Sequence, residues 1–208
     1  GLLRKRILTA YKNATRMTRL VNELLDFNKM EVGNLKLHVQ QGEWVHFIRD
    51  TASAFNEMAM RQGIKFSIEA ATMDVMGWAD RDKLERILFN VLSNAFKYTA
   101  NGGEIKLKIN LVEKNVADVV SCQCLELVIE DNGIGILPHE LPHIFEKFYQ
   151  AKSSSKITSP GTGIGLSYTK ALVELHNGSI RAESIPDQST IFTIILPIDG
   201  RMYQAEEK

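Results

Sequence analysis

The chain has 208 residues, of which 44% are hydrophobic and 24% are charged, as in an ordinary globular protein. This composition excludes collagen-like, low-complexity and largely disordered proteins, and the length allows one or two domains with a real core. Lys+Arg and Asp+Glu both number 25, so the net charge is zero and we expect no nucleic-acid partner. The two cysteines, Cys122 and Cys124, are too few for a disulfide scaffold or a four-cysteine zinc site.

Hydropathy argues against a membrane span within this chain. No apolar stretch approaches the roughly 18 residues that a span needs, and no signal peptide precedes the first predicted helix. We therefore expect a soluble chain in a reducing compartment, with both cysteines as small reduced residues on a strand. A membrane span elsewhere in a longer parent protein stays open.

The first predicted element is a helix from Leu2 to about Met30, a segment without proline or glycine. Its apolar residues recur with the spacing of a coiled-coil seam at Leu3, Ile7, Ala10, Ala14, Met17, Val21 and Leu24. Leu20 and Phe27 widen this seam toward that of a helical bundle. We expect residues 1–33 to pair with another helix in a dimerisation bundle; the alternative is a helix packed on its own domain.

The rest of the chain alternates between strand and helix patterns. Strands are predicted at 35–39, 64–70, 75–78, 104–112, 125–130, 179–184 and 190–196. Helices are predicted at 44–61, 80–98 and 164–176, and the polar segment 149–160 is a predicted loop. This order predicts an α+β fold, a two-layer sandwich with one layer of helices on one sheet. We expect the domain to span residues 34–200, followed by a tail at 201–208.

Three segments carry residues suited to chemistry. Residues 131–136, Asp-Asn-Gly-Ile-Gly-Ile, directly follow a predicted strand. Residues 161–166, Gly-Thr-Gly-Ile-Gly-Leu, lead into the predicted helix 164–176. The third segment is one side of the predicted helix 80–98, which carries Asn90, Asn94, Lys97 and Tyr98.

Each segment alone is a weak signal. Asp-Asn-Gly is a common turn, and Asn90 and Asn94 could be two satisfied core amides. The glycine-rich segment 161–166 lacks the preceding strand of a dinucleotide fingerprint, and the chain has no P-loop motif. The combination is more specific. Backbone N–H groups at the start of a helix can bind phosphate, amide oxygens can hold Mg²⁺, and a buried carboxylate can accept a hydrogen bond from an adenine amino group.

At these residues the sequence resembles the GHKL ATP-binding superfamily, and within it the sensor histidine kinases of two-component signalling. Residues 84–99 resemble the family's N box, 131–135 its G1 box, 144–149 its F box and 161–166 its G2 box. The opening helix is similar to the second helix of the family's dimerisation and phosphoacceptor domain. The sequences of this helix and of the linker after it most resemble those of hybrid sensors of the Bacteroides type.

The resemblance implies a GHKL (Bergerat) fold with a mixed sheet, and ATP and Mg²⁺ as ligands. Asp131 would accept a hydrogen bond from the adenine amino group, Tyr98 would lie beside the base or ribose, and Asn94 would bind Mg²⁺. Asn90 would lie beside the phosphates, Lys97 would contact phosphate, and residues 149–160 would form a lid. Further implied ATP contacts are Gly133, Gly135, Ile136, Lys147, Phe148, Gly161, Thr162, Gly163, Gly165 and Leu166.

The sequence departs from the family pattern at two places near the site. Gln150 stands where many members have an arginine that contacts phosphate, and Lys147, Lys152 or Lys156 could replace it only as a point charge. Residues 187–190, Asp-Gln-Ser-Thr, stand where the family often has a Gly-x-Gly-Thr turn. We expect a different hairpin there, with little effect on the chemistry.

A larger departure concerns the phosphoacceptor, which in such kinases is a histidine followed by Glu or Asp and then by Pro. Among the five histidines only His139, followed by Glu140-Leu141-Pro142, has such a context. It lies between the G1 and F boxes, so we interpret it as a surface residue. His176 ends a predicted helix, where a histidine favours the helix dipole. We therefore expect the acceptor on a first helix that this sequence lacks.

The leading interpretation is the ATP-binding catalytic domain of a sensor histidine kinase, which transfers the γ-phosphoryl group to that missing histidine. Its expected partners are the missing helix, a response-regulator receiver domain and a second copy of the parent, the cytoplasmic portion of an inner-membrane sensor. The alternatives are an ATP-hydrolysing protein of the gyrase, mismatch-repair or Hsp90 kind, and a non-catalytic dimerising module. Hydrolysing members have a water-activating Glu one turn before the metal-binding Asn, where this chain has Asn90, which cannot act as a base.

Overall fold

The computed structural model describes residues 35–117, 119–151 and 162–204, together with Arg6 and Met17. The chain divides into two compact units, residues 1–36 and 37–208. The predicted dimerisation helix at 1–33 lies outside the described residues except for Arg6 and Met17, and so does most of the predicted lid. Within the described part of the chain, we find no helix with the length and apolar character needed to cross a membrane.

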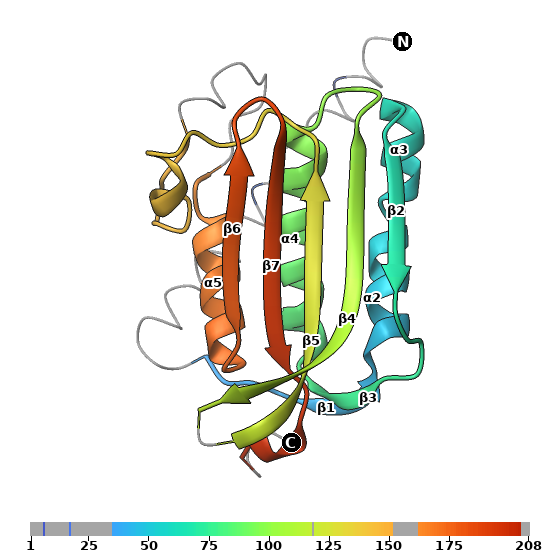
Figure 1. Ribbon diagram of the computed structural model, residues 1–208, viewed down its shortest axis with the longest axis vertical. Coiled ribbons are helices and arrows are strands. Elements are labelled where there is room, and N and C mark those ends of the chain that lie inside the picture. Colours follow the sequence, from blue (N-terminus) through green and yellow to red (C-terminus); the bar gives the residue numbers. More distant parts are fainter. Residues whose placement is uncertain (1–5, 7–16, 18–34, 118, 152–161, 205–208) are drawn as a thin grey trace. The chain divides into compact units, whose positions relative to one another are not determined.

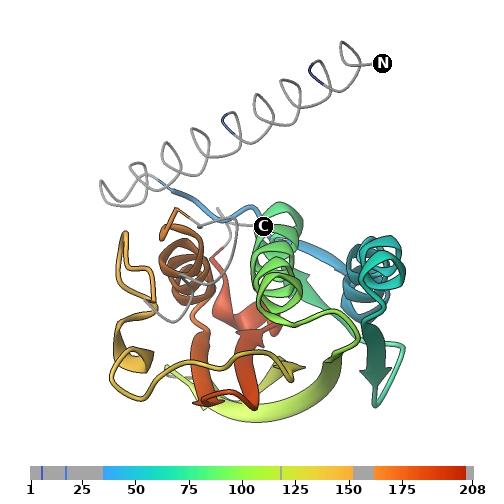
Figure 2. The ribbon, with the colours of Figure 1, turned by 90° about the horizontal axis from the view of Figure 1, so that it is seen from above.

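The second unit is a two-layer α+β sandwich, in which helices cover one face of a five-stranded sheet (Figures 1 and 2). The sheet has the order β2-β4-β5-β7-β6. These strands are β2 (Lys65–Ala70), β4 (Glu104–Val116), β5 (Val119–Asp131), β6 (Ser179–Ile185) and β7 (Ser189–Pro197). Only β2 and β4 pair in parallel, so the sheet is mixed, as the resemblance implied. A separate antiparallel pair joins β1 (Gln40–Glu43) to β3 (Met76–Ala79).

The helical layer packs an apolar side against the sheet. It comprises α2 (Trp44–Ser53), α3 (Asn56–Gln62), α4 (Arg81–Tyr98) and α5 (Gly165–Leu175). The described residues also form the 3-10 turns η1 (Leu141–His143) and η3 (Gly200–Met202). The buried side of α4 consists of Leu84, Ile87, Leu88, Val91, Leu92, Ala95 and Phe96. It faces alternating buried residues of β4 and β5: Ile105, Leu107, Ile109, Leu125, Leu127 and Ile129. The predicted fold class and the helix at 80–98 are therefore confirmed.

Two predicted elements differ from the structure. Residues 35–39 form no strand; Leu37 and Val39 are instead buried in an irregular segment that packs against Tyr203. Their apolar alternation reflects this packing and not a sheet ladder. The predicted helix 44–61 is two helices, because the chain turns after α2 and Phe55 stacks on Phe96 with ring centroids 5.3 Å apart.

Asp80 begins α4 as its N-cap and joins three parts of the domain. Its carboxylate accepts from Lys83 N at 3.1 Å, from Lys83 Nζ at 2.5 Å and from His38 N at 2.8 Å. Burial alone would raise the pKa of Asp80, but these donors outweigh it and hold the pKa below its ordinary value.

His176 does end α5, as predicted. Its buried ring, however, accepts from Asp80 N at 3.4 Å and pairs through Nδ1 with Leu172 O at 2.8 Å.

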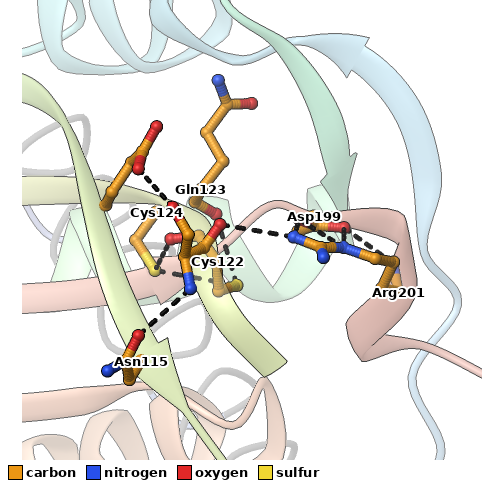
Figure 3. Close-up of polar contacts among 8 residues, drawn as sticks. Asn115, Cys122, Gln123, Cys124, Asp199 and Arg201 are labelled. Atoms are coloured by element: carbon orange, nitrogen blue, oxygen red, sulfur yellow. Dashed lines mark hydrogen bonds and ion pairs between the residues drawn. The ribbon is translucent and has the colours of Figure 1, made fainter. Parts of the chain in front are cut away.

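The hairpin of β4 and β5 is longer than predicted, because its register runs from Ile105 opposite Asp131 out to Val116 opposite Val119. Its far end contains the two cysteines, whose thiols are free and fully buried with Sγ atoms 4.0 Å apart (Figure 3). The predicted position of both cysteines on a strand is confirmed.

Arg201 of η3 holds that far end of the hairpin in place. It forms an ion pair of 2.6 Å with Asp199 and donates to Ser121 O at 3.3 Å (Figure 3). The hairpin end is distant from the residues predicted for chemistry, which lie at the opposite end of the sheet (Figure 1).

Candidate functional site

The predicted site residues meet at the end of the domain where α4 and β5 finish and α5 begins (Figure 1). Backbone hydrogen bonds join these elements directly. Ile134 N, in the loop after β5, donates to Tyr98 O at 3.2 Å, at the end of α4. The structure thus places the N-box helix against the G1 loop, although they are more than thirty residues apart in sequence.

Asp131 provides a buried carboxylate at the end of β5. Its side chain is 4% exposed, and Oδ1 accepts from Gly133 N at 2.9 Å. Burial raises the pKa of Asp131 to about 6, and the charge of Glu130 adds to this effect while the Gly133 N–H opposes it. A Cβ atom at position 133 would lie only 2.7 Å from Asp131 Oδ1, so a glycine is needed there. Above pH 6 this carboxylate can accept a further hydrogen bond from a ligand amino group.

The G1 loop is supported by the β6–β7 hairpin, a contact that the sequence analysis missed. Ile136 N donates to Ser184 Oγ at 2.8 Å, and Asp187 N donates to Ile134 O at 2.8 Å. Gly135 has a φ of +65°, the left-handed region that glycine tolerates best. The departure at residues 187–190 therefore lies against the G1 loop. No local pattern could have shown this, because Ser184 is 48 residues from its partner.

The N-box face of α4 presents four half-buried polar side chains, those of Asn90, Asn94, Lys97 and Tyr98. Lys97 lies over the Tyr98 ring, with Nζ 4.8 Å from the ring centroid and 3.2 Å from the hydroxyl oxygen. The ammonium group and the aromatic ring therefore sit together at the end of α4, beside the G1 loop. The amides of Asn94 and Asn90 lie one and two turns earlier, respectively, on the same side of α4.

Asn90 contacts the first turn of α5. Its Nδ2 donates to Thr169 Oγ1 at 2.6 Å, and a Cβ atom at Gly165 would lie 2.5 Å from Asn90 Oδ1. The N box and the G2 glycines are therefore in direct contact. Thr169 was not among the predicted site residues, because its contact with Asn90 depends on the packing of α4 against α5.

The F box joins the G2 segment through its backbone. Phe148 N donates to Gly163 O at 2.9 Å, and both residues have positive φ, +61° and +72°. The Phe148 side chain is 66% exposed. A Cβ atom at position 163 would lie 2.6 Å from the Phe148 carbonyl carbon, so the two segments pack closely only because residue 163 is glycine.

Of the remaining predicted site residues, the structure describes Thr162, Leu166 and Lys147. Thr162 Oγ1 lies 3.5 Å from Ile164 N, and Leu166 is half-buried in the first turn of α5. Lys147 and Gln150 are exposed. Gly161 and the two lid lysines, Lys152 and Lys156, lie outside the described residues.

His139 is exposed in the loop between the G1 and F boxes, which confirms its interpretation as a surface residue. The following Glu140 is 1% exposed, and Leu141 begins the short turn η1. The resemblance of this segment to an acceptor motif is therefore not matched by a long helix, such as the one that carries the family's acceptor.

The chemistry of these groups fits a magnesium-bound adenine nucleotide. Asp131 is an acceptor suited to an amino group, and the start of α5 offers free N–H groups and a favourable dipole to phosphate. The carboxamide oxygens of Asn90 and Asn94 are hard ligands of the kind Mg²⁺ prefers. Among the described residues, no cluster of three or more His, Cys, Asp or Glu side chains offers a competing metal site.

Comparisons with known proteins agree with this geometry. Residues 79–200, more than half of the chain, match the family model described as "Histidine kinase-, DNA gyrase B-, and HSP90-like ATPase". The hybrid signal transduction histidine kinase D of Dictyostelium discoideum is 34% identical over 203 residues, which cover 96% of this chain and 13% of that protein. The chain therefore belongs to this ATPase family, as the ATP-binding catalytic domain of a two-component sensor histidine kinase.

Solved structures show the same fold. Full-length ShkA in complex with AMPPNP matches with a TM-score of 0.73 and 22% identity, over 88% of this chain and 36% of that one. Histidine kinase ThkA in complex with the response regulator protein TrrA matches with a TM-score of 0.65 and 19% identity, over 89% and 49%. The chain spans only 13 to 30% of the length of the first three curated relatives that it matches.

Proposed function

We propose that this domain binds ATP with Mg²⁺ and transfers the γ-phosphoryl group to a histidine on another segment or chain, and that it does not hydrolyse ATP at a useful rate. The observation that carries the proposal is Asn90. At the position where hydrolysing family members would need a general base, this chain has an amide that already donates to Thr169. An amide cannot take a proton from water, whereas transfer to a nucleophile held elsewhere needs no base there.

Each part of the site has a role in that transfer. Asp131 selects adenine by accepting from its amino group, and Tyr98 lies beside the base or ribose. Lys97 and the N–H groups of the G2 segment 161–166 hold the phosphates and orient the terminal one. When bound through Asn94, Mg²⁺ would neutralise phosphate charge. The described residues thus act mainly by positioning and electrostatics, which dominate catalysis of phosphoryl transfer.

The proposal extends to the whole protein. The opening helix 1–33 would pair in a dimerisation bundle, its apolar seam bringing the acceptor histidine near the nucleotide. The phosphoryl group would then pass to a response-regulator receiver domain, consistent with the complex formed by ThkA. The parent would be a hybrid sensor of the Bacteroides type, with this domain in the cytoplasm beneath an inner membrane.

The test follows the label from ATP carrying ³²P in its γ-phosphate. This chain is incubated with Mg²⁺ and a fragment of the parent protein that carries the proposed acceptor histidine. We expect an acid-labile, alkali-stable label on the fragment, little label on the chain itself, and the same outcome for His139→Gln. Steady release of inorganic phosphate without labelling of the fragment, or self-labelling lost in His139→Gln, would refute the proposal.

A further inference from the structure

Thr169 is a buried polar residue of α5 to which the proposed function assigns no role. Its side chain is 1% exposed, and its hydroxyl accepts from Asn90 Nδ2 at 2.6 Å. The two residues are 79 positions apart, so this contact exists only because α4 and α5 pack side by side (Figure 2). At this distance the hydrogen bond is slightly shorter than is usual for an amide N–H donor.

Gly165 makes the second contact with the Asn90 carboxamide. It lies one helical turn before Thr169, on the same side of α5. A Cβ atom at position 165 would lie 2.5 Å from Asn90 Oδ1 and 3.0 Å from Nδ2. The carboxamide therefore rests against the glycine Cα, with its nitrogen end held by the threonine hydroxyl.

The orientation matters because the two ends of a carboxamide have similar shape and opposite polarity. With Nδ2 bound to Thr169, Oδ1 lies at Gly165, the first residue of α5. Phosphates and their magnesium ion belong at that helix start under the proposed function, and a hard cation or its bound water needs an oxygen there. An amide turned the other way would present two N–H donors to the cation instead.

We infer that Thr169 is a positioning residue, which fixes the Asn90 carboxamide with its oxygen toward the metal and phosphate end of the site. This inference rests on the proposed function and adds a residue to it. Thr169 acts only through Asn90, and it lies on the G2 helix, so it ties the orientation of an N-box ligand to the placement of the G2 segment.

The primary test is Thr169→Val, which removes the hydroxyl group that accepts from Asn90 and keeps the shape of the side chain. Binding of a non-hydrolysable ATP analogue is measured by calorimetry with Mg²⁺, and binding of ADP is measured in EDTA. We expect the variant to bind the analogue with Mg²⁺ about five- to tenfold more weakly, the value of one hydrogen bond. Affinity for ADP without metal should stay within about twofold, and Thr169→Ser, which keeps the hydroxyl, should restore binding.

Two controls separate positioning from general packing. Thr193→Val changes a buried threonine of β7 and should leave both affinities unchanged. In an Asn90→Ala background, Thr169→Val should have no further effect on magnesium-dependent binding, because the group it orients is gone. Thermal unfolding is recorded for each variant, and Thr169→Ala replaces the valine variant should that one not fold.

The outcomes distinguish this inference from the proposed function. Equal losses with and without metal, an undiminished effect in the Asn90→Ala background, or failure of Thr169→Ser to restore binding would each overturn the positioning role. In all three cases ATP binding by the unaltered chain would still support the proposed function. Absence of ATP binding by the unaltered chain would overturn both.

Discussion

Replacing the buried carboxylate in Asp131→Asn should weaken ATP binding and, at neutral pH, increase the stability of the folded state. At pH 7.5 the variant should bind ATP about 10- to 100-fold more weakly, because a charge-assisted hydrogen bond to the adenine amino group is worth about 1.5–3 kcal/mol. GTP, which presents a carbonyl at that place, should bind poorly to both proteins. Calorimetry with ATP and GTP measures these affinities.

The same substitution should stabilise the folded state at neutral pH, because it removes a buried ionised carboxylate. The pKa of Asp131 is raised from its ordinary 3.8 to about 6, so the folded state holds this proton more tightly than the unfolded state. The stability due to that proton is full below pH 3.8 and is lost as the pH rises through about 6. This difference in pKa is worth about 3 kcal/mol, because each pK unit corresponds to 1.36 kcal/mol.

The stability difference between Asp131→Asn and the unaltered protein should therefore grow by about 2.4 kcal/mol in favour of the variant between pH 4 and pH 7, since a small part of the effect is already present at pH 4. Urea unfolding of ligand-free protein measures it, and the comparison cancels any constant cost of the buried amide. Asp74→Asn is the control, since it removes an exposed carboxylate from the segment between β2 and β3. Equal ATP affinity of variant and unaltered protein, or a stability difference that does not change with pH, would refute the reasoning.

Three further predictions concern other parts of the domain. Asn94→Ala should weaken magnesium-dependent ATP binding by at least about tenfold and leave ADP binding in EDTA nearly unchanged, as calorimetry would show. Gly163→Ala places a Cβ 2.6 Å from the Phe148 carbonyl carbon at a φ of +72°, so urea unfolding should show a loss of about 2 kcal/mol. Cys122 and Cys124 should react with a thiol reagent only on unfolding, because both are fully buried and burial raises the pKa of Cys124 to about 12; rapid reaction of the native protein would contradict this.

Periodic apolar patterns predicted most of the fold. The helix at 80–98 has its apolar residues on one side, and in the structure that same side is buried against the sheet. The long strand β5 was predicted only in part, because Cys122 and its neighbours lie at the hairpin end, where pairing with β4 alone extends the ladder. Leu37 and Val39 misled the prediction, since an irregular segment that packs against Tyr203 shows the same alternation as a strand.

The candidate site was predictable to the extent that its residues occur in local motifs. Asp131 and the glycines around it form one short segment, and so do the residues of the N-box helix. The supports of that site come from distant parts of the chain: Thr169 holds Asn90, and the β6–β7 hairpin holds the G1 loop through Ser184 and Asp187. Such contacts depend on how helices and strands pack, so no spacing along the sequence indicates them.

The central claim is that the N, G1, F and G2 segments form one site for ATP and a divalent cation. A crystal structure of this chain with a non-hydrolysable ATP analogue and Mn²⁺, whose anomalous scattering locates the ion, tests it most directly. We predict the adenine amino group within hydrogen-bond distance of Asp131, the ion bound to Asn94, and the phosphates at the start of α5. An adenine ring away from Asp131, or an ion bound elsewhere than at the N-box face, would contradict the claim.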